Sequence, residues 1–173
     1  MLTVEWISCL NTLQCRREIA SKVLRLPPIV NVQWPVSPSS LSSSLWDRAF
    51  PSYVCIVKRT GPNEVHWVSV VAESRAKVVF FNSSCRYDVR DVKDCISSLC
   101  QSRNCDFVSA PTTHLQCKSD FGCQTWSLVF LAAHKQRRTP TRKLYQTLVS
   151  KIARSTVMKV WLRDSVPCGA GRG

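Results

Sequence analysis

The segment Cys123–His134 (CQTWSLVFLAAH) constrains the fold most, because it is apolar almost all round and contains no proline or glycine. A helix that is hydrophobic on every side is stable only in the centre of a domain. Asp120 and Gly122 precede it, and these residue types are typical of a helix cap and a tight turn. We therefore expect a buried helix that begins at Cys123, with the rest of the chain packed around it.

Two segments rich in β-branched and aromatic residues, Val65–Ala72 and Lys77–Asn82, are separated by four polar or small residues. This pattern predicts a β-hairpin. Further strands are expected at Tyr53–Lys58 and Asp106–Ala110. Strands and helices are therefore both expected in the chain, which indicates the α+β class.

Apolar residues at helical spacing predict three other helices. They span Leu10–Leu24, which ends before Pro27, then Asp88–Cys100, and finally a single amphipathic helix over Leu144–Val157. Pro140 is expected near the start of the last one.

Two segments are expected to be irregular. The serine-rich stretch 37–44 (SPSSLSSS) predicts a flexible polar loop, and the glycine-rich end, from about residue 166 to 173, predicts a mobile tail. With 173 residues, the chain is long enough for one hydrophobic core, so we expect a single domain over residues 1–173.

The charge is strongly positive, with 24 Lys and Arg against 11 Asp and Glu. Between Lys135 and Arg163 there are nine basic residues and no acidic one. Such a block favours binding to a polyanion, although a solvated helix face is the alternative. The residues expected to contact nucleic acid are Lys135, Arg137, Arg138, Arg142, Lys143, Lys151 and Arg154.

No apolar run approaches the roughly 20 residues that span a bilayer, and Met1–Leu10 carries an acidic residue and no basic one. We expect an intracellular protein without a membrane partner, in which most of the ten cysteines are reduced core residues. A zinc site at Cys95, Cys100, Cys105, His114 and Cys117 is disfavoured by the spacing of five residues, so no metal is expected.

Cys123 is the candidate nucleophile, because the N-terminus of a helix and a nearby imidazolium both stabilise a thiolate. Three histidines compete for the role of its base. His134 lies eleven residues further along the same helix, about 16 Å away at a rise of ~1.5 Å per residue, which is too far. His114 lies in a loop and stays open, whereas His66 lies in a predicted strand beside Trp67. We therefore favour His66.

Asn82 ends the strand that pairs with the strand of His66, so its side chain can orient the imidazole. Gln116, seven residues before Cys123, can donate its amide to a developing oxyanion. The alternatives for these two residues are a turn residue and an exposed loop glutamine.

The order of His66-Trp67, Phe80-Phe81-Asn82 and Gln116–Cys123 (QCKSDFGC) resembles the adenovirus proteases (adenain) and the wider SUMO-protease-like clan of cysteine peptidases. The segment 53–67 (YVCIVKRTGPNEVHW) is also similar to that family. The resemblance implies a papain-like or SUMO-protease-like fold, in which a central mixed sheet packs between helices and the nucleophile lies at the N-terminus of the buried helix. It implies Cys123 as nucleophile, His66 as base, Asn82 as orienter and Gln116 as oxyanion donor, with Trp67 beside the oxyanion site.

One position departs from the clan pattern, because the orienting residue there is usually a carboxylate and here is Asn82. Asp88 and Asp91 are the alternatives. The resemblance further implies cleavage of viral precursor proteins during virion maturation, in the host nucleus and virion. DNA and a short viral peptide would be the activators. The tail Cys168–Gly171 is similar to the cleavage sites of that family, which suggests self-cleavage there.

Two other functions stay open at this point. The same residues would serve a ubiquitin- or SUMO-like isopeptidase, and a non-catalytic nucleic-acid-binding protein would account for the basic block alone. The presence of His66, Gln116 and Cys123 together favours the peptidase, because a decayed enzyme usually loses one of them.

Overall fold

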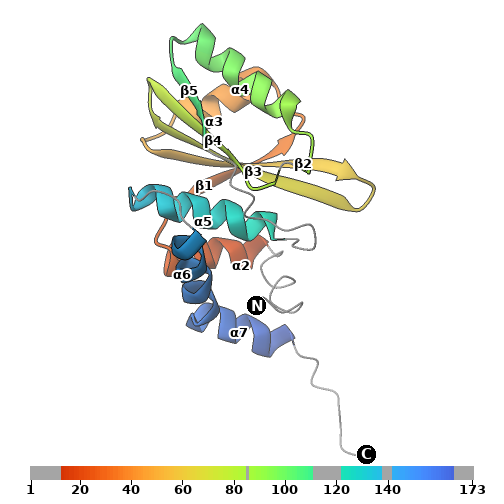
Figure 1. Cartoon of the computed structure of the whole chain (residues 1–173), viewed down its shortest axis with the longest axis vertical. Helices are drawn as coiled ribbons and strands as arrows, with labels where there is room; N and C mark the ends of the chain where they lie inside the picture. Colours follow the sequence, from red (N-terminus) through yellow and green to blue (C-terminus); the bar gives the residue numbers. More distant parts are fainter. Residues whose placement is uncertain (1–12, 85, 111–121, 138–141, 166–173) are drawn as a thin grey trace, which may run out of the picture.

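A five-stranded mixed sheet forms the centre of the molecule, and helices cover both of its faces (Figure 1). The computed structural model describes residues 13–84, 86–110, 122–137 and 142–165. The strands lie side by side in chain order: β1 (Ile29–Trp34), β2 (Ser52–Gly61), β3 (Glu64–Ser74), β4 (Lys77–Asn82) and β5 (Asp106–Ser109). The three central strands are antiparallel, and β1 and β5 pair in parallel with β2 and β4. The expected α+β class with a mixed sheet is confirmed.

The two faces of the sheet bury alternate residues of each strand. On β3, Val68 and Val70 face a cluster built with α3 (Pro38–Trp46) and α4 (Arg90–Ser102). Trp67 and Val71 face the opposite cluster, which contains α5 (Cys123–Lys135) and the helices packed on it. Both faces are therefore dry in the centre of the sheet, as the near-continuous apolar sequence of β3 requires.

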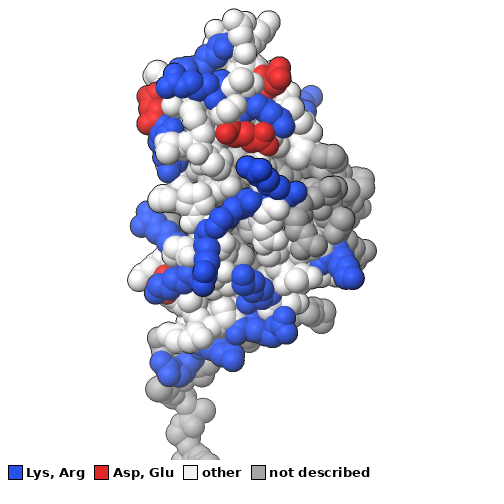
Figure 2. Space-filling view, turned by 90° about the vertical axis from the view of Figure 1, so that its left-hand side faces the viewer, with Lys and Arg blue, Asp and Glu red and all other residues white. Residues whose placement is uncertain are grey.

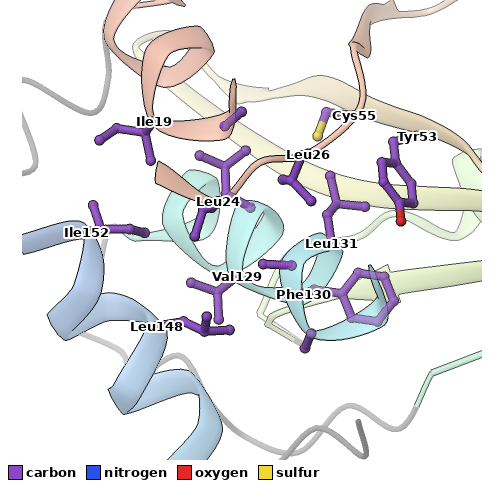
Figure 3. Packing of buried hydrophobic residues seen from close by; sticks show 14 of the residues in the cluster. Ile19, Leu24, Leu26, Tyr53, Cys55, Val129, Phe130, Leu131, Leu148 and Ile152 are labelled. Carbon is purple, nitrogen blue, oxygen red and sulfur yellow. The ribbon is translucent and has the colours of Figure 1, made fainter. Parts of the chain in front are cut away.

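Helix α5 lies between the sheet and a second layer of helices, as its apolar sequence predicts. Every residue from Leu128 to Ala133 is buried. Figure 3 shows Val129 near Leu148 of α6. It also shows Leu131 pointing toward Tyr53, which belongs to the sheet. The second layer consists of α2 (Leu13–Glu18), the π-helical turn η1 (Ile19–Val23), α6 (Arg142–Ala153) and α7 (Thr156–Ser165).

The prediction of a flexible loop over residues 37–44 is wrong, because this segment forms α3. Ser37 caps the helix by accepting a hydrogen bond from the Ser40 backbone N–H at 3.2 Å, and Pro38 occupies the first turn. Leu41 and Leu45, one turn apart, are fully buried against the sheet. The serines occupy the more exposed face of this short amphipathic helix. The prediction failed because it relied on the high serine content and not on the spacing of the two leucines.

The prediction of one helix over Leu144–Val157 is also wrong, because the chain forms two helices there. α6 ends at Ala153 and α7 begins at Thr156. Ser155 separates them: its Oγ donates to the Ile152 carbonyl at 2.6 Å and accepts from the Met158 N–H at 3.2 Å. A serine that caps the next helix ends the continuous helical pattern.

Strand β1 was not predicted, because its sequence IVNVQW lies between prolines and includes the polar residues Asn31 and Gln33. It is an edge strand, and only Val32 is buried. The predicted hairpin, the strands near Tyr53 and Asp106 and the helix after Asp88 are confirmed. Leu10, Asp120, Pro140 and the tail from residue 166 lie outside the described residues.

None of the helices in the described ranges is both long and apolar enough to cross a membrane. Cys55, Cys95, Cys100 and Cys105 are free thiols, consistent with the expectation of reduced core cysteines. Across the described residues, no three His, Cys, Asp or Glu side chains are grouped to hold a metal ion. His114 and Cys117 of the disfavoured zinc cluster lie outside those residues.

The cap of α3 gives a direct test of this correction. We expect Ser37→Ala to lower the free energy of unfolding by about 1 kcal/mol, because the helix loses its N-cap. Ser43→Ala, on the exposed side of the same helix, is the matched control and should change it by less than ~0.5 kcal/mol. Urea denaturation measures both. Equal values for the two variants would contradict the capping role.

Candidate active site

His66 and Asn82 meet on one face of the β3–β4 hairpin. The register places Val68 opposite Asn82, so His66 is the diagonal neighbour of Asn82 on the same face. His66 Nε2 and Asn82 Oδ1 are 2.6 Å apart. The Ser84 backbone N–H also donates to Asn82 Oδ1, at 3.3 Å, which identifies this atom as the amide oxygen. His66 therefore carries its proton on Nε2, and Nδ1 is left to accept a proton.

The imidazole of His66 is fully buried, and burial lowers its pKa. The hydrogen bond to Asn82 and the nearby negative charge of Glu64 act in the opposite direction. Within the described part of the chain, Nδ1 has no hydrogen-bond partner. A neutral histidine with an available Nδ1 is the form that a general base requires at neutral pH.

Tyr87 covers the imidazole from the segment that precedes α4. Its ring stacks on His66 with the centroids 4.4 Å apart and the planes 26° from parallel. Its hydroxyl donates to Glu64 Oε1 at 2.6 Å, and this bond raises the pKa of Tyr87. Glu64 lies two residues before His66 on β3, so the strand and the tyrosine together hold the ring in one plane.

Cys123 is the first residue of α5, with Gly122 at the N-cap. Its side chain is 7% exposed. The Trp126 backbone N–H donates to the Gly122 carbonyl at 2.9 Å, which closes the first helical turn over Cys123. The first N–H groups of a helix favour a negative charge, so this position suits both a thiolate and an oxyanion.

Two serine contacts fix the beginning of α5 on β3. Ser69 Oγ donates to the Ser127 carbonyl at 3.2 Å, and Ser127 Oγ donates to the Trp67 carbonyl at 3.5 Å. Ser127 lies one turn after Cys123, and Trp67 follows His66, so the start of the helix lies against the strand that carries the histidine. An ionised Cys123 would raise the pKa of Tyr87, and the ring of Tyr87 stacks on His66.

Four other described cysteines are poorer nucleophiles, because burial raises the pKa of each thiol. The pKa rises to about 11 for Cys55 and to about 12 for Cys100. It is also raised for Cys95 and Cys105. A buried thiol with a raised pKa stays protonated and unreactive at neutral pH.

The remaining candidates divide into three groups. Asp91 binds Lys58 at 2.7 Å and Trp34 at 3.0 Å, while Asp88 pairs with Arg90 at 2.9 Å, so both alternatives to Asn82 are engaged elsewhere. His134 Nε2 lies 2.8 Å from Glu73 Oε1, near the opposite end of α5 from Cys123. Gln116 and His114 lie outside the described residues.

The basic block is largely on the surface. Lys135, Arg137, Lys143, Lys151 and Arg154 are exposed. Figure 2 shows Lys and Arg side chains gathered down one face of the molecule, with few acidic side chains among them. Arg138 and the side chain of Arg142 lie outside what the structure describes.

Sequence reasoning missed three residues at this site. Glu64 and Tyr87 were not singled out, although the i, i+2 spacing of Glu64 and His66 on a strand places both on one face. Arg16 was also missed. Its guanidinium lies over the Trp67 ring, 3.5 Å from the centroid. Its helical spacing to the buried Ala20 and Val23 was the available signal.

Comparison with protein-family models and with curated proteins finds no match. Among solved structures, the chain is similar to the SUMO protease Ulp1, with 9% identity, a TM-score of 0.41 and coverage of 86% of this chain and 75% of that one. It is similar to the ASFV pS273R protease, with 13% identity, a TM-score of 0.46 and coverage of 94% and 66%. It is also similar to the central domain of the Lpg1148 protein from Legionella pneumophila, with 17% identity, a TM-score of 0.40 and coverage of 82% and 90%. Likeness at this level says nothing about substrate, and a specific relation to adenovirus proteases stays a prediction.

The contact between His66 and Asn82 predicts how the histidine responds to a charge. We expect Asn82→Asp to raise the pKa of His66 by about 1 to 2 units, because a carboxylate stabilises the imidazolium more than an amide does. NMR titration of the His66 ring protons measures this shift. Asn104→Asp, at an exposed turn after α4, is the isosteric control and should leave the titration unchanged. An unaltered His66 titration in Asn82→Asp would show that the contact is absent in solution.

Proposed function

We propose that the chain is a cysteine peptidase in which Cys123 is the nucleophile, His66 the general base and Asn82 the orienting residue. The observation that carries the proposal is the 2.6 Å contact between His66 Nε2 and Asn82 Oδ1, with His66 on the strand to which the helix that begins at Cys123 is hydrogen-bonded through Ser127. An amide that fixes the imidazole tautomer, next to a cysteine at a helix N-terminus, is the arrangement of a Cys-His-Asn hydrolase.

The chemistry follows from the two nitrogens of His66. Asn82 retains the proton on Nε2, so Nδ1 takes the proton of Cys123 as the sulfur bonds to the carbonyl carbon of the substrate. The imidazolium then gives that proton to the leaving amine as the C–N bond breaks, which leaves a thioester on Cys123. Water attacks the thioester with His66 as base, and the acid product leaves as the thiol is restored.

The negative charge that develops on the substrate oxygen needs donors. The first backbone N–H groups of α5 are available next to Cys123. On the proposal, the Gln116 amide and the Trp67 backbone N–H complete this site. A peptide bond is the proposed substrate, and the sequence resemblance extends the proposal to precursor proteins of a DNA virus that are cleaved during virion maturation.

The basic surface supports the second half of the proposal, that a polyanion such as DNA binds and activates the enzyme. A hollow of about 810 Å³ is lined by four basic residues: Lys22, Arg25, Lys151 and Arg154. Glu18 is the only acidic residue among the described residues that line it, and it is paired with Lys22 at 3.3 Å. A hollow with this surplus of cations suits phosphate groups.

Thiol labelling tests the catalytic pair. We expect a chloroacetamide-type reagent at pH 7 to modify Cys123 first, and His66→Ala to slow that reaction at least about tenfold, because the base that stabilises the thiolate is lost. Peptidase turnover should fall by about 10²- to 10⁴-fold in the same variant and vanish in Cys123→Ala. Mass spectrometry locates the label.

His134→Ala is the matched control, because this histidine belongs to the same helix layer and pairs with Glu73. It should leave the labelling rate at Cys123 unchanged. Slow labelling spread over several cysteines in the wild-type chain would overturn the peptidase proposal. Cleavage of folded ubiquitin-like fusions, with no cleavage of unfolded peptides, would assign an isopeptidase instead.

Salt dependence tests the polyanion site separately. We expect the logarithm of the DNA affinity to fall linearly with the logarithm of salt concentration. Neutralising Lys151 and Arg154 to Gln should reduce the slope by about 2, because two phosphate contacts are lost. The matched control replaces two other exposed arginines by Gln: Arg59, near the end of β2, and Arg75, in the turn between β3 and β4. A flat salt response, or equal effects of the two pairs, would reject this site.

A further inference from the structure

A buried positive charge lies beside Cys123. Arg16 of α2 is only 5% exposed, although arginine is rarely buried without an anionic partner. In residues 13–84, 86–110, 122–137 and 142–165, no carboxylate is paired with its guanidinium. A buried cation surrounded by neutral groups is costly, so its position calls for an anion at some stage of the function.

The described groups that contact Arg16 are all neutral. One terminal nitrogen donates to Gln124 Oε1 at 3.2 Å, and the other donates to Asn31 Oδ1 at 2.9 Å. The guanidinium plane also lies over the Trp67 ring, 3.5 Å from its centroid. Gln124 follows Cys123 and Trp67 follows His66, so Arg16 is fixed to the residue after each member of the proposed catalytic pair.

Among the described residues, two thiols could supply an anion close to Arg16. Burial lowers the pKa of Arg16, while the charges of ionised Cys55 and Cys123 would raise it. Cys55 is itself buried, and its pKa is about 11, so it stays protonated at neutral pH. Cys123, at the N-terminus of α5, is the thiol that remains to form a thiolate there.

We propose that Arg16 is a positioning residue that holds Cys123 in its thiolate form and fixes the first turn of α5 through Gln124. The proposal rests on Cys123 being the nucleophile of the proposed function. Arg16 suits this role better than lysine, because its planar guanidinium binds two amide oxygens and an indole face at once. Arg16 and Cys123 are both buried, so screening of the charge by solvent is weak.

Several other charged or titratable groups face this region, and the test must separate them from Arg16. They are Arg17 on α2, Cys55 on β2, Glu64 and His66 on β3, and Arg86 and Tyr87 before α4. Arg17 is the closest in sequence and is exposed. It therefore provides a control of equal charge on the same helix.

The experiment measures the pH dependence of alkylation at Cys123 in the full-length chain, with the modified site read by mass spectrometry. We expect Arg16→Gln to raise the midpoint of this profile by about one unit or more, because the thiolate loses a nearby opposite charge. Arg16→Lys retains a charge and should give a smaller shift. Arg17→Gln should give none.

Turnover provides a readout that a purely structural role would not move. The kcat/KM of Arg16→Gln should be low at pH 7 and recover part of the loss at higher pH, where the thiolate forms without help. A loss that is equal at every pH, together with an unchanged alkylation midpoint in the folded variant, would overturn the role assigned to Arg16.

A second measurement uses the wild-type chain, so it does not depend on whether the Arg16 variants fold. In the wild-type chain, the ¹⁵Nε resonance of Arg16 should shift with the ionisation of Cys123, and Cys123→Ser should abolish this transition. An Arg16 resonance whose chemical shift does not change at the alkylation midpoint of Cys123 would overturn the inference. A wild-type midpoint near the ordinary thiol pKa of about 8.5 would instead count against the proposed peptidase itself, so the two failures are distinguishable.

Discussion

The burial of α5 is the constraint on which the rest of the structure depends. A helix with apolar residues on all sides must be covered on all sides. The sheet covers one side of α5, and α6 with the rest of the second layer covers the other. Each fully buried Leu or Phe of this helix contributes roughly 1.5–3 kcal/mol, so the helix cannot shift along the sheet without a large loss. Its first residue, Cys123, is therefore fixed relative to β3. The bonds of Ser127 to Trp67 and of Ser69 to Ser127 set the register of that packing.

The same dry surroundings determine the state of the histidine. Removing His66 from water disfavours the imidazolium, and Asn82 offsets this only in part because it brings no charge. The result is a neutral imidazole whose Nε2 is committed to Asn82 and whose ring is fixed by Tyr87. The site thus gives up some stabilisation of the charged form and keeps a base that is unprotonated at neutral pH.

The sequence predicted the parts of the fold that depend on long periodic patterns. The β3–β4 hairpin and α5 combine strong patterns with clear ends, and the pairing of His66 with Asn82 follows from them. The errors occur where the helical pattern is short or ends at a single residue. Helix α3 was predicted as a loop because five of its residues are serines. The break between α6 and α7 depends on one capping side chain, that of Ser155. The roles of Arg16 and Tyr87 were missed for another reason, because they arise from contacts across 51 and 21 residues of chain, to Trp67 and His66. Helical spacing could show that Arg16 lies on the buried face of α2, but not which residue it contacts.

Two departures from a common Cys-His-acid arrangement belong together in this chain. A carboxylate bonded to the histidine would stabilise the imidazolium and, through it, the thiolate; Asn82 does this less well. A cation near the sulfur acts directly on the thiolate and needs no charge on the histidine. Arg16 is held in such a position, bonded to Gln124, the residue after Cys123, and stacked on Trp67, the residue after His66. If these proposed roles hold, the amide at position 82 and the buried guanidinium act together to stabilise the thiolate of Cys123. The guanidinium of Arg16 supplies to the Cys123 thiolate the stabilisation that a carboxylate at position 82 would otherwise provide through His66.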